Sequence, residues 1–314
     1  MKFGAFTPQG WRLDLQGFEN GFAEYQAMRD GALRLEKLGY DSAWLYDHFH
    51  TVPEARLEPT FEVWTATAAL AEATSAIRLG QMCGCNIYRP PALLAKMTSV
   101  IDCVSNGRLE FGLGAGWYEH ETVAYGYDFE RPALRIGKLD EAVQIIKGMW
   151  TQNHFQFQGK HYTVGHGEVK DYGGNKVELQ GAINHPKPIQ SPHPPMWIAG
   201  GGEQLTLKTV ARYADGFGPE KGLIIDRDST RGNNIIRDLV NLAHANGMQV
   251  HPYTFRLDPG QVPDYANSFE ELLQLYYFDA DIDGAIASLT CAWRISNQAS
   301  VSALKLARYV KFLI

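Results

Sequence analysis

The residues best suited to chemistry in this chain come directly after segments that look like strands. Asp47 and His48 follow Ser42–Tyr46, whose apolar residues predict a buried strand. A carboxylate beside an imidazole can hold or deliver a proton near neutral pH. In a structural interpretation, Asp47 caps a turn and His48 is an ordinary surface histidine. Strand ends favour function in α/β barrels, and both interpretations stay open.

Two cysteines two positions apart end the next predicted strand. Cys83 and Cys85 are followed by Asn86. This spacing can bind metal, but no second Cys or His pair matches it, so a zinc site is not expected. Small residues at the end of a buried strand more often let a flat ligand approach the backbone or form a bulge. Small core cysteines would give the same pattern.

A glycine-rich segment follows the fourth predicted strand. Gly112, Gly114 and Gly116 alternate with Leu113 and Ala115, and Trp117 and Tyr118 come next. A ligand could lie on this backbone between aromatic walls. The spacing is not GxGxxG, and no acidic residue clearly ends a strand about 20 residues later, so a Rossmann dinucleotide site is not favoured.

A second glycine segment opens a predicted helix. Gly200, Gly201 and Gly202 precede Glu203 directly. Exposed N–H groups at a helix N-terminus can cradle a phosphate, which favours a phosphate-bearing cofactor. The alternative is a flexible turn without a ligand. The HExxH, GxSxG and Walker A patterns are absent.

The elements that must position these residues alternate between strands and helices. Gly39 follows one predicted helix and Pro91 begins another, as is typical of helix ends. The alternation predicts a parallel sheet covered by crossover helices. The expected strands are 2–6, 42–46, 77–82 and 108–113, and the expected helices are 22–38, 61–73, 92–104 and 134–150.

Residues 151–193 interrupt the alternation, and we expect an insertion there after the fourth βα unit. An eighth strand is hard to place. Seven or eight βα units predict a (β/α)8 TIM barrel in one domain over residues 1–314, with an open doubly wound sheet as the competitor. The later expected strands are 196–199, 215–217 and 250–255, and the later expected helices are 203–213, 235–245, 269–277 and 302–312.

The composition narrows the classes of protein. There are 29 Lys and Arg against 35 Asp and Glu, a net charge of −6, which argues against a nucleic-acid partner. No signal peptide and no apolar stretch of roughly 20 residues is present, so we expect a cytoplasmic protein without a membrane partner. The 4 cysteines do not make a disulfide scaffold.

Taken together, these segments resemble the bacterial luciferase-like oxidoreductases, and within them the group described as coenzyme F420-dependent. The resemblance covers about residues 1–220. It rests on four linked motifs in the right order: GYDSAWLYDHF (39–49), RPPALLAKMTSVIDCVSNGRLEFGLGAGW (89–117), AYGYDF (124–129) and HPPMWIAGGGEQLTLKTVARYADGF (193–217).

The resemblance implies a barrel that binds a flavin or 5-deazaflavin at its C-terminal face. His48, with Asp47 beside it, would lie near the reacting face of the ring. A bulge often containing a non-proline cis peptide would fall within Cys83–Asn86, so that Cys85 and Asn86 back the ring. The remaining contacts, to the ring edge and the phosphate, would come from Gly114, Ala115, Trp117, Gly200, Gly201 and Gly202.

Two departures from the family pattern limit what the resemblance transfers. Some deazaflavin dehydrogenases carry an acidic residue just after the glycines of the fourth strand, where this chain has Trp117. An acid/base role is therefore not expected there. Residues after about 225 do not match the usual family ending, so the C-terminal part is atypical.

The activity expected from the resemblance is hydride transfer between coenzyme F420 and a small organic substrate. His48 would donate or accept the accompanying proton, and Asp47 would orient it. The same scaffold could hold reduced FMN in a monooxygenase, or bind cofactor without catalysis. Aromatic residues in the insertion, such as Phe155 and Tyr172, favour an apolar substrate, or else they cover the barrel. Relatives are often dimers, which suggests a homodimer.

Overall fold

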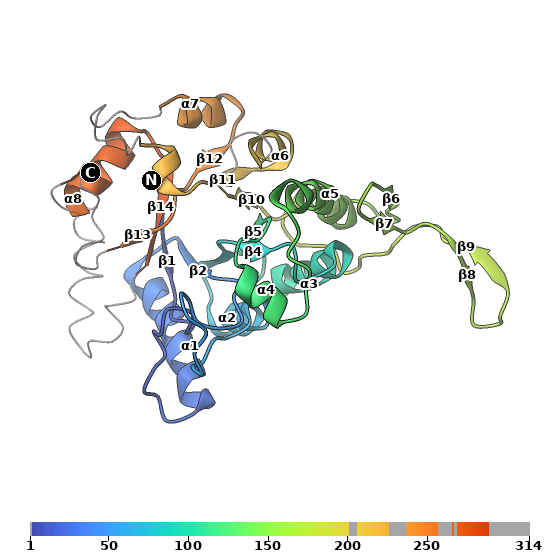
Figure 1. The fold of residues 1–314 in the computed structure, drawn as a ribbon, viewed down its shortest axis with the longest axis horizontal. Helices are drawn as coiled ribbons and strands as arrows, with labels where there is room; N and C mark the ends of the chain where they lie inside the picture. The colour runs from blue at the N-terminus through green and yellow to red at the C-terminus, as the bar shows by residue number, and fades with distance from the viewer. Residues whose placement is uncertain (1, 201–205, 226–236, 257–265, 267–268, 289–314) are drawn as a thin grey trace.

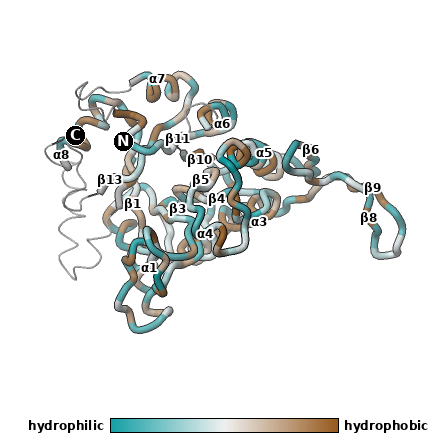
Figure 2. Tube along the Cα trace, viewed as in Figure 1, coloured by the Kyte–Doolittle hydropathy of each residue, from teal (hydrophilic) through white to brown (hydrophobic). Residues whose placement is uncertain are grey.

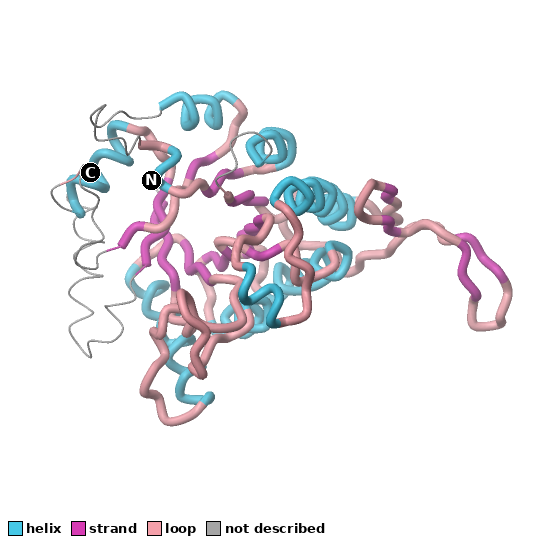
Figure 3. Tube along the Cα trace, viewed as in Figure 1, coloured by secondary structure: helices cyan, strands magenta, loops and turns pink. Residues whose placement is uncertain are grey.

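Parallel strands form the inner ring of the molecule. The computed structural model describes residues 2–200, 206–225, 237–256, 266 and 269–288. Neighbouring strands pair in parallel in the order β1, β2, β3, β5, β10, β11, and helices lie outside them (Figure 3). These strands are β1 (Lys2–Phe6), β2 (Ser42–Leu45), β3 (Arg78–Gln81), β5 (Leu109–Gly114), β10 (Met196–Ala199) and β11 (Gly216–Gly218).

The ring is closed by the C-terminal third of the described chain. β12 (Gln249–Val250) pairs with β11, and β13 (Phe255–Arg256) pairs with β14 (Gly284–Ser288), which returns to β1. Since β12 and β13 are two halves of one segment, the strands form the eight-stranded barrel predicted from the sequence. The eighth strand, which the sequence did not place, is β14. A short strand, β4 (Gly84–Cys85), pairs beside β5.

Helices surround the barrel where amphipathic segments were predicted (Figure 1). The Asn20 side chain accepts hydrogen bonds from the amides of Phe22 and Ala23 at the start of α1, and Gly39 ends α1 with φ 79°. The helices are α1 (Gly21–Leu38), α2 (Val63–Ala73), α3 (Pro91–Val104), α4 (Glu119–Ala124), α5 (Pro132–Thr151), α6 (Thr206–Tyr213), α7 (Arg237–Ala245) and α8 (Phe269–Gln274). Short 3-10 and π turns cover Lys221–Leu223 and Leu275–Asp279.

Aromatic rings fill the inside of the barrel. Trp44 and Trp197 meet edge to face, with ring centroids 6.2 Å apart. Each ring lies against a glycine on the next strand: a Cβ at Gly80 or Gly216 would come within 2.4 Å of the indole of Trp44 or Trp197. Within the described residues, the barrel interior is therefore a packed core.

The expected insertion at 151–193 forms two hairpins. β6 (Phe157–Gln158) pairs with β7 (Thr163–Val164) close to the barrel, and β8 (Glu168–Lys170) pairs with β9 (Lys176–Glu178) at the end of a long projection. The segment after it returns along α3, where Ile189 N–H donates to the Asp102 carboxylate. This return leads the chain to β10.

Several predictions can be compared with the described residues. The long helices and the first four strands lie where the sequence placed them, within one to three residues at their ends. The short helix α4 was not predicted. The helix expected at 302–312 lies outside the described residues. None of the described helices is long and apolar enough to cross a membrane.

Candidate functional site

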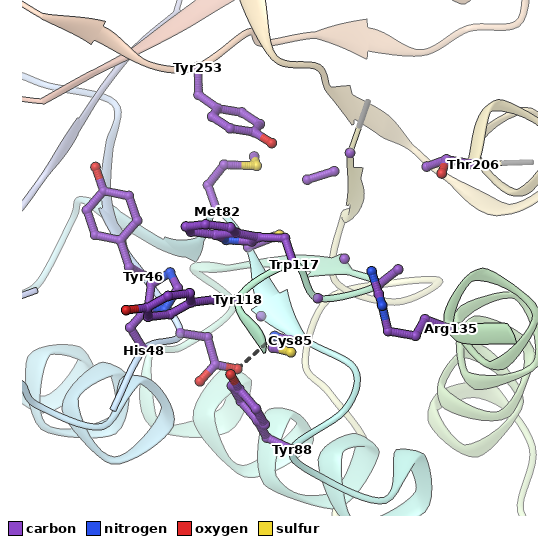
Figure 4. Close-up of a pocket in the computed structure, with 18 of the residues that line it drawn as sticks. Tyr46, His48, Met82, Cys85, Tyr88, Trp117, Tyr118, Arg135, Thr206 and Tyr253 are labelled. Carbon is purple, nitrogen blue, oxygen red and sulfur yellow. Dashed lines mark hydrogen bonds between the residues drawn. The ribbon is translucent and has the colours of Figure 1, made fainter. Parts of the chain in front are cut away.

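A cavity of about 510 Å³ opens among the C-terminal ends of the strands (Figure 4). Its walls come from the segments that follow β1, β2, β3, β5, β10 and the β12–β13 segment. Most of the residues predicted to act line it. The lining includes Trp11, Tyr46, Asp47, His48, Cys83, Cys85, Gly114, Ala115, Trp117, Tyr118, Arg135, Gly200, Thr206 and Tyr253.

His48 is held rigidly at one end of this cavity. Its ring stacks on Trp11, with centroids 4.4 Å apart and planes 3° from parallel, and Trp117 meets it edge-on at 5.8 Å. Its Nδ1 lies 2.9 Å from Oε2 of Glu121. A carboxylate oxygen accepts, so Nδ1 carries hydrogen. Nε2 has no hydrogen-bond partner among the described residues and is left for a ligand.

Glu121 is a fully buried carboxylate that the sequence did not single out as functional. It lies on α4 and also accepts from the Tyr88 hydroxyl at 2.7 Å and from the amides of Phe49 and His50 at 2.6 and 3.2 Å. Burial acts to raise the pKa of Glu121, but the bonds from His48, Tyr88 and Phe49 outweigh it, and the pKa is lowered. Glu121 is therefore ionised and fixes the tautomer of His48.

Asp47 has a different role from the one predicted. Its two oxygens bind Arg89 Nη1 and Nη2 at 2.7 and 3.1 Å, and Oδ2 also accepts from the Cys85 amide at 2.8 Å. The prediction that Asp47 orients His48 is wrong, because both of its oxygens are used elsewhere and Glu121 holds the imidazole. Burial raises the pKa of Asp47, and Arg89 acts in the opposite direction. Asp47 ties the His48 loop to β4.

The segment after β3 forms the floor of the cavity. The cis peptide joins Met82 to Cys83, at the start of the predicted segment Cys83–Asn86. Cys83 and Cys85 line the cavity as free thiols, and burial raises the pKa of Cys83 to about 12. Asn86 is buried and is not among the lining residues, so its expected cofactor contact is not seen here.

The glycines at the end of β5 and just after it allow the backbone there to lie close to the segment after β3. A Cβ at Gly114 would come within 2.6 Å of the Cys83 sulfur, and one at Gly116 would come within 2.9 Å of the Cys85 sulfur. Gly116 also has φ 82°, a conformation that favours glycine. Trp117 follows at the mouth, where 61% of its surface is exposed. These glycines shape a shallow, apolar floor against which a flat ring can lie.

The end of the cavity away from His48 carries a cationic group. Arg135 of α5 packs over the Phe129 ring at 4.0 Å and donates from Nη1 to the Glu130 carbonyl. Its Nε is buried and has no hydrogen-bond partner in the described part of the chain. Thr206 lies on the same side of the cavity as Arg135 (Figure 4), and Gly200 is also among the lining residues. Gly201 and Gly202, predicted to bind phosphate, lie outside the described residues.

These features fit an elongated ligand with a flat ring and an anionic tail. The ring would lie on the Cys83–Gly116 floor beside His48, and the tail would reach the guanidinium group of Arg135, which lines the cavity. Among the described residues, no group of three His, Cys, Asp or Glu side chains could hold a metal ion.

Sequence reasoning missed four residues that build the site. Trp11 follows the first strand, so the strand-end rule could have found it, and Tyr253 lies between β12 and β13 within the segment of the seventh strand. Arg135 and Glu121 come from helices outside the barrel. Glu121 is 73 positions from His48, and nothing in the sequence pairs them.

Comparison with known proteins gives the family context. The model of the family described as luciferase-like monooxygenase matches residues 1–222. An F420-dependent glucose-6-phosphate dehydrogenase of Kineococcus radiotolerans is 30% identical over 216 residues, which are 66% of this chain and 55% of that enzyme. An FMNH2-dependent dimethylsulfone monooxygenase of Pseudomonas putida is 28% identical over 166 residues, 51% of this chain and 38% of that enzyme.

Solved structures share the whole fold at low identity. An F420-dependent secondary alcohol dehydrogenase, solved with an F420-acetone adduct, superposes with a TM-score of 0.71 at 16% identity, covering 100% of this chain and 99% of that one. EDTA monooxygenase from Chelativorans sp. BNC1 gives 0.68 at 13% identity, covering 100% and 93%. At these identities the likeness concerns the barrel architecture.

Proposed function

Because the chain belongs to the luciferase-like monooxygenase family, we propose that it is an oxidoreductase that transfers hydride between coenzyme F420 and a small organic alcohol or carbonyl compound. The observation that carries the proposal is the cavity itself. It has an imidazole nitrogen without a protein partner at one end and the guanidinium group of Arg135 at the other. A flat redox ring with a phosphate-bearing tail matches this arrangement, because the ring can lie beside the imidazole and the phosphate beside the guanidinium.

The deazaflavin supplies the hydride chemistry when it is bound, and the protein supplies position and proton transfer. The floor and Trp117 would hold the ring, so that the reacting carbon of a substrate lies about 3–3.5 Å from it. Aromatic side chains on the walls exclude water and favour an apolar substrate. Tyr253 points its hydroxyl into the cavity and offers a second polar contact (Figure 4).

His48 would manage the proton. With hydrogen fixed on Nδ1 by Glu121, Nε2 can accept the hydroxyl proton of an alcohol as it is oxidised, and can return it in the reverse reaction. Glu121 stabilises the charged imidazole without contacting substrate. Asp47 and Arg89 keep the loop that carries His48 in place.

The choice of F420 over FMN rests on the identity to F420-dependent glucose-6-phosphate dehydrogenases across the motif-bearing part of the chain. A reduced-FMN monooxygenase is the rival, because the dimethylsulfone enzyme matches part of the same region. The test is titration of the purified protein with F420 and with reduced FMN, followed by F420 reduction with a panel of short alcohols. Tight FMN binding with oxygen consumption and no F420 binding would refute the proposal.

A variant pair tests the role of the imidazole. His48→Ala should leave the Kd for F420 within about threefold and lower turnover by about 10²–10⁴-fold. His50→Ala, on the same loop but outside the cavity lining, is the matched control and should keep turnover. Equal turnover in both variants would mean that His48 handles no proton.

A further inference from the structure

The hairpin β8–β9 stands apart from the barrel. We call residues 168–178 the arm; it lies at the end of the long projection in Figure 1. All six residues of its two strands are exposed. In each strand one valine lies between two charged residues, and the arm is hydrophilic over most of its length (Figure 2). A two-stranded hairpin alone in water is marginally stable, and further strands or a packed face are normally needed to hold it.

The pairing within the arm is electrostatically unfavourable. Glu168 lies directly opposite Glu178, and Lys170 lies directly opposite Lys176. Like charges that face each other across a strand pair destabilise a hairpin. The diagonal ion pair from Lys176 to Glu168, 2.6 Å long, is exposed and offsets little of this. The unfavourable charge pairs would be compensated if a further strand placed an opposite charge beside each of these side chains.

The backbone of the arm is ready to accept such a strand. The bonds from Asp171 N–H to the Asn175 carbonyl and from Leu179 N–H to the Gly167 carbonyl fix which residues bond within the hairpin. By the alternation of antiparallel pairing, residues 168 and 170 on β8 then turn their N–H and C=O groups to the outer edge. The same holds for residues 176 and 178 on β9.

We propose that an edge of the arm pairs with the same edge of the arm in a second copy of this chain, across a twofold axis. The sequences are Glu-Val-Lys on β8 and Lys-Val-Glu on β9. A twofold axis that pairs β8 with β8 of the second copy at Val169 sets each Glu168 opposite a Lys170, and its outward backbone groups meet. An axis at Val177 on β9 has the same effect.

The occupant is a second copy because the pattern is complementary to itself. Under the twofold axis, both charge pairs become favourable and the central valine meets its own symmetry mate. Val169 and Val177 are 41% and 40% exposed in the single chain and would form one apolar face on the joined sheet. The alternative is that these charged side chains prevent the exposed strand edges from pairing with another chain, in which case the protein is a monomer.

Charge variants of equal net charge test the pairing. Glu168→Lys with Lys176→Glu places opposite charges across the hairpin, so the isolated arm is stabilised, but like charges meet at either edge under the twofold axis. We expect the dimer Kd to rise about tenfold or more. The quadruple exchange of Glu168, Lys170, Lys176 and Glu178 to the opposite charges restores the complementarity and should keep the dimer. Light scattering and sedimentation would compare each species with twice the chain mass of 35.1 kDa.

Cysteine cross-linking identifies the edge. The central residues of a twofold strand pair lie about 4.5 Å apart between Cα atoms, within disulfide reach. Val169→Cys should therefore give a covalent dimer on mild oxidation if β8 is used, and Val177→Cys if β9 is used. Tyr172→Cys in the turn is the control and should stay uncrosslinked. A wild-type monomer would overturn the proposal, as would a dimer that survives the double variant and cross-links at neither valine.

Discussion

Replacing Glu121 by Gln would test whether the buried carboxylate sets the tautomer of the His48 imidazole. Gln has the same shape but no charge, and one acceptor oxygen becomes a donor NH2 group. Its oxygen can keep the amide donors of Phe49 and His50, which leaves the NH2 group facing His48 Nδ1 and the Tyr88 hydroxyl. Nδ1 must then accept, so the ring hydrogen moves to Nε2. The nitrogen that faces the cavity can no longer take a proton from substrate.

The structure sets the size of the effect. Two donors lose a carboxylate acceptor, at about 1.5–3 kcal/mol for each such bond, and the new amide contacts recover part of it. We expect a net loss of about 2–4 kcal/mol in the free energy of unfolding at pH 7. We expect turnover to fall by about 10²–10⁴-fold.

The loss of stability should depend on pH in a definite direction. Because the pKa of Glu121 is lowered from its ordinary value of 4.5, its carboxylate contributes stability above that value, and this is lost as the pH falls through the lowered pKa. The stability difference between wild type and Glu121→Gln should therefore shrink in acid.

Three measurements test the effect of Glu121→Gln on the His48 tautomer, the stability and the turnover. Long-range ¹H–¹⁵N NMR of the imidazole shows which nitrogen of His48 carries hydrogen, and thermal unfolding at neutral and acidic pH gives the stability. Turnover is measured with the alcohol found in the panel. Glu119→Gln, an exposed position on the same helix α4, is the matched control and should change none of these. A Glu121→Gln variant that keeps the Nδ1–H tautomer and normal turnover would refute the reasoning.

Three further predictions concern the floor and the far end of the cavity. Asp47→Asn should lower the free energy of unfolding by about 1.5–3 kcal/mol in urea, because Arg89 loses its bidentate carboxylate and keeps only the ion pair with Glu62; unchanged stability would contradict the pairing. Iodoacetamide at pH 8 should leave Cys83 and Cys85 unlabelled in the folded protein and label both in urea, since burial raises the pKa of each thiol. Arg135→Met should weaken binding of FMN or F420 by about tenfold or more but leave riboflavin, which lacks phosphate, almost unchanged; equal losses would place the phosphate elsewhere.

The barrel could be predicted from sequence over most of its length. Buried strands and amphipathic helices alternate clearly up to about residue 217, and helix ends are marked by Gly39 and Pro91. The eighth strand was not predicted because Gly284–Ser288 consists mostly of small residues, with neither alternation nor flanking signals. The seventh is split into β12 and β13 around Tyr253, which weakens its pattern further.

The site residues that follow strands could be predicted from the sequence. The site residues that come from helices could not. His48 and the β5 glycines stand at strand ends, and the barrel rule brings them together. Sequence adjacency suggested Asp47 as the partner of His48, but the fold gives Asp47 to Arg89 and supplies Glu121 from α4. Contacts between segments so far apart in the sequence depend on tertiary packing, so a local sequence pattern cannot predict them.

The seventh strand has a consequence for how this enzyme can diverge. Tyr253 and Thr254 line the cavity but lie beyond residue 222, where the family match ends, whereas His48 and the glycine floor lie within it. The residues of this wall can therefore change in evolution while His48 and the glycine floor stay the same. Paralogues could exchange the C-terminal segment to accept new compounds while retaining the ancestral coenzyme, and laboratory evolution aimed at 253 and 254 would follow the same route.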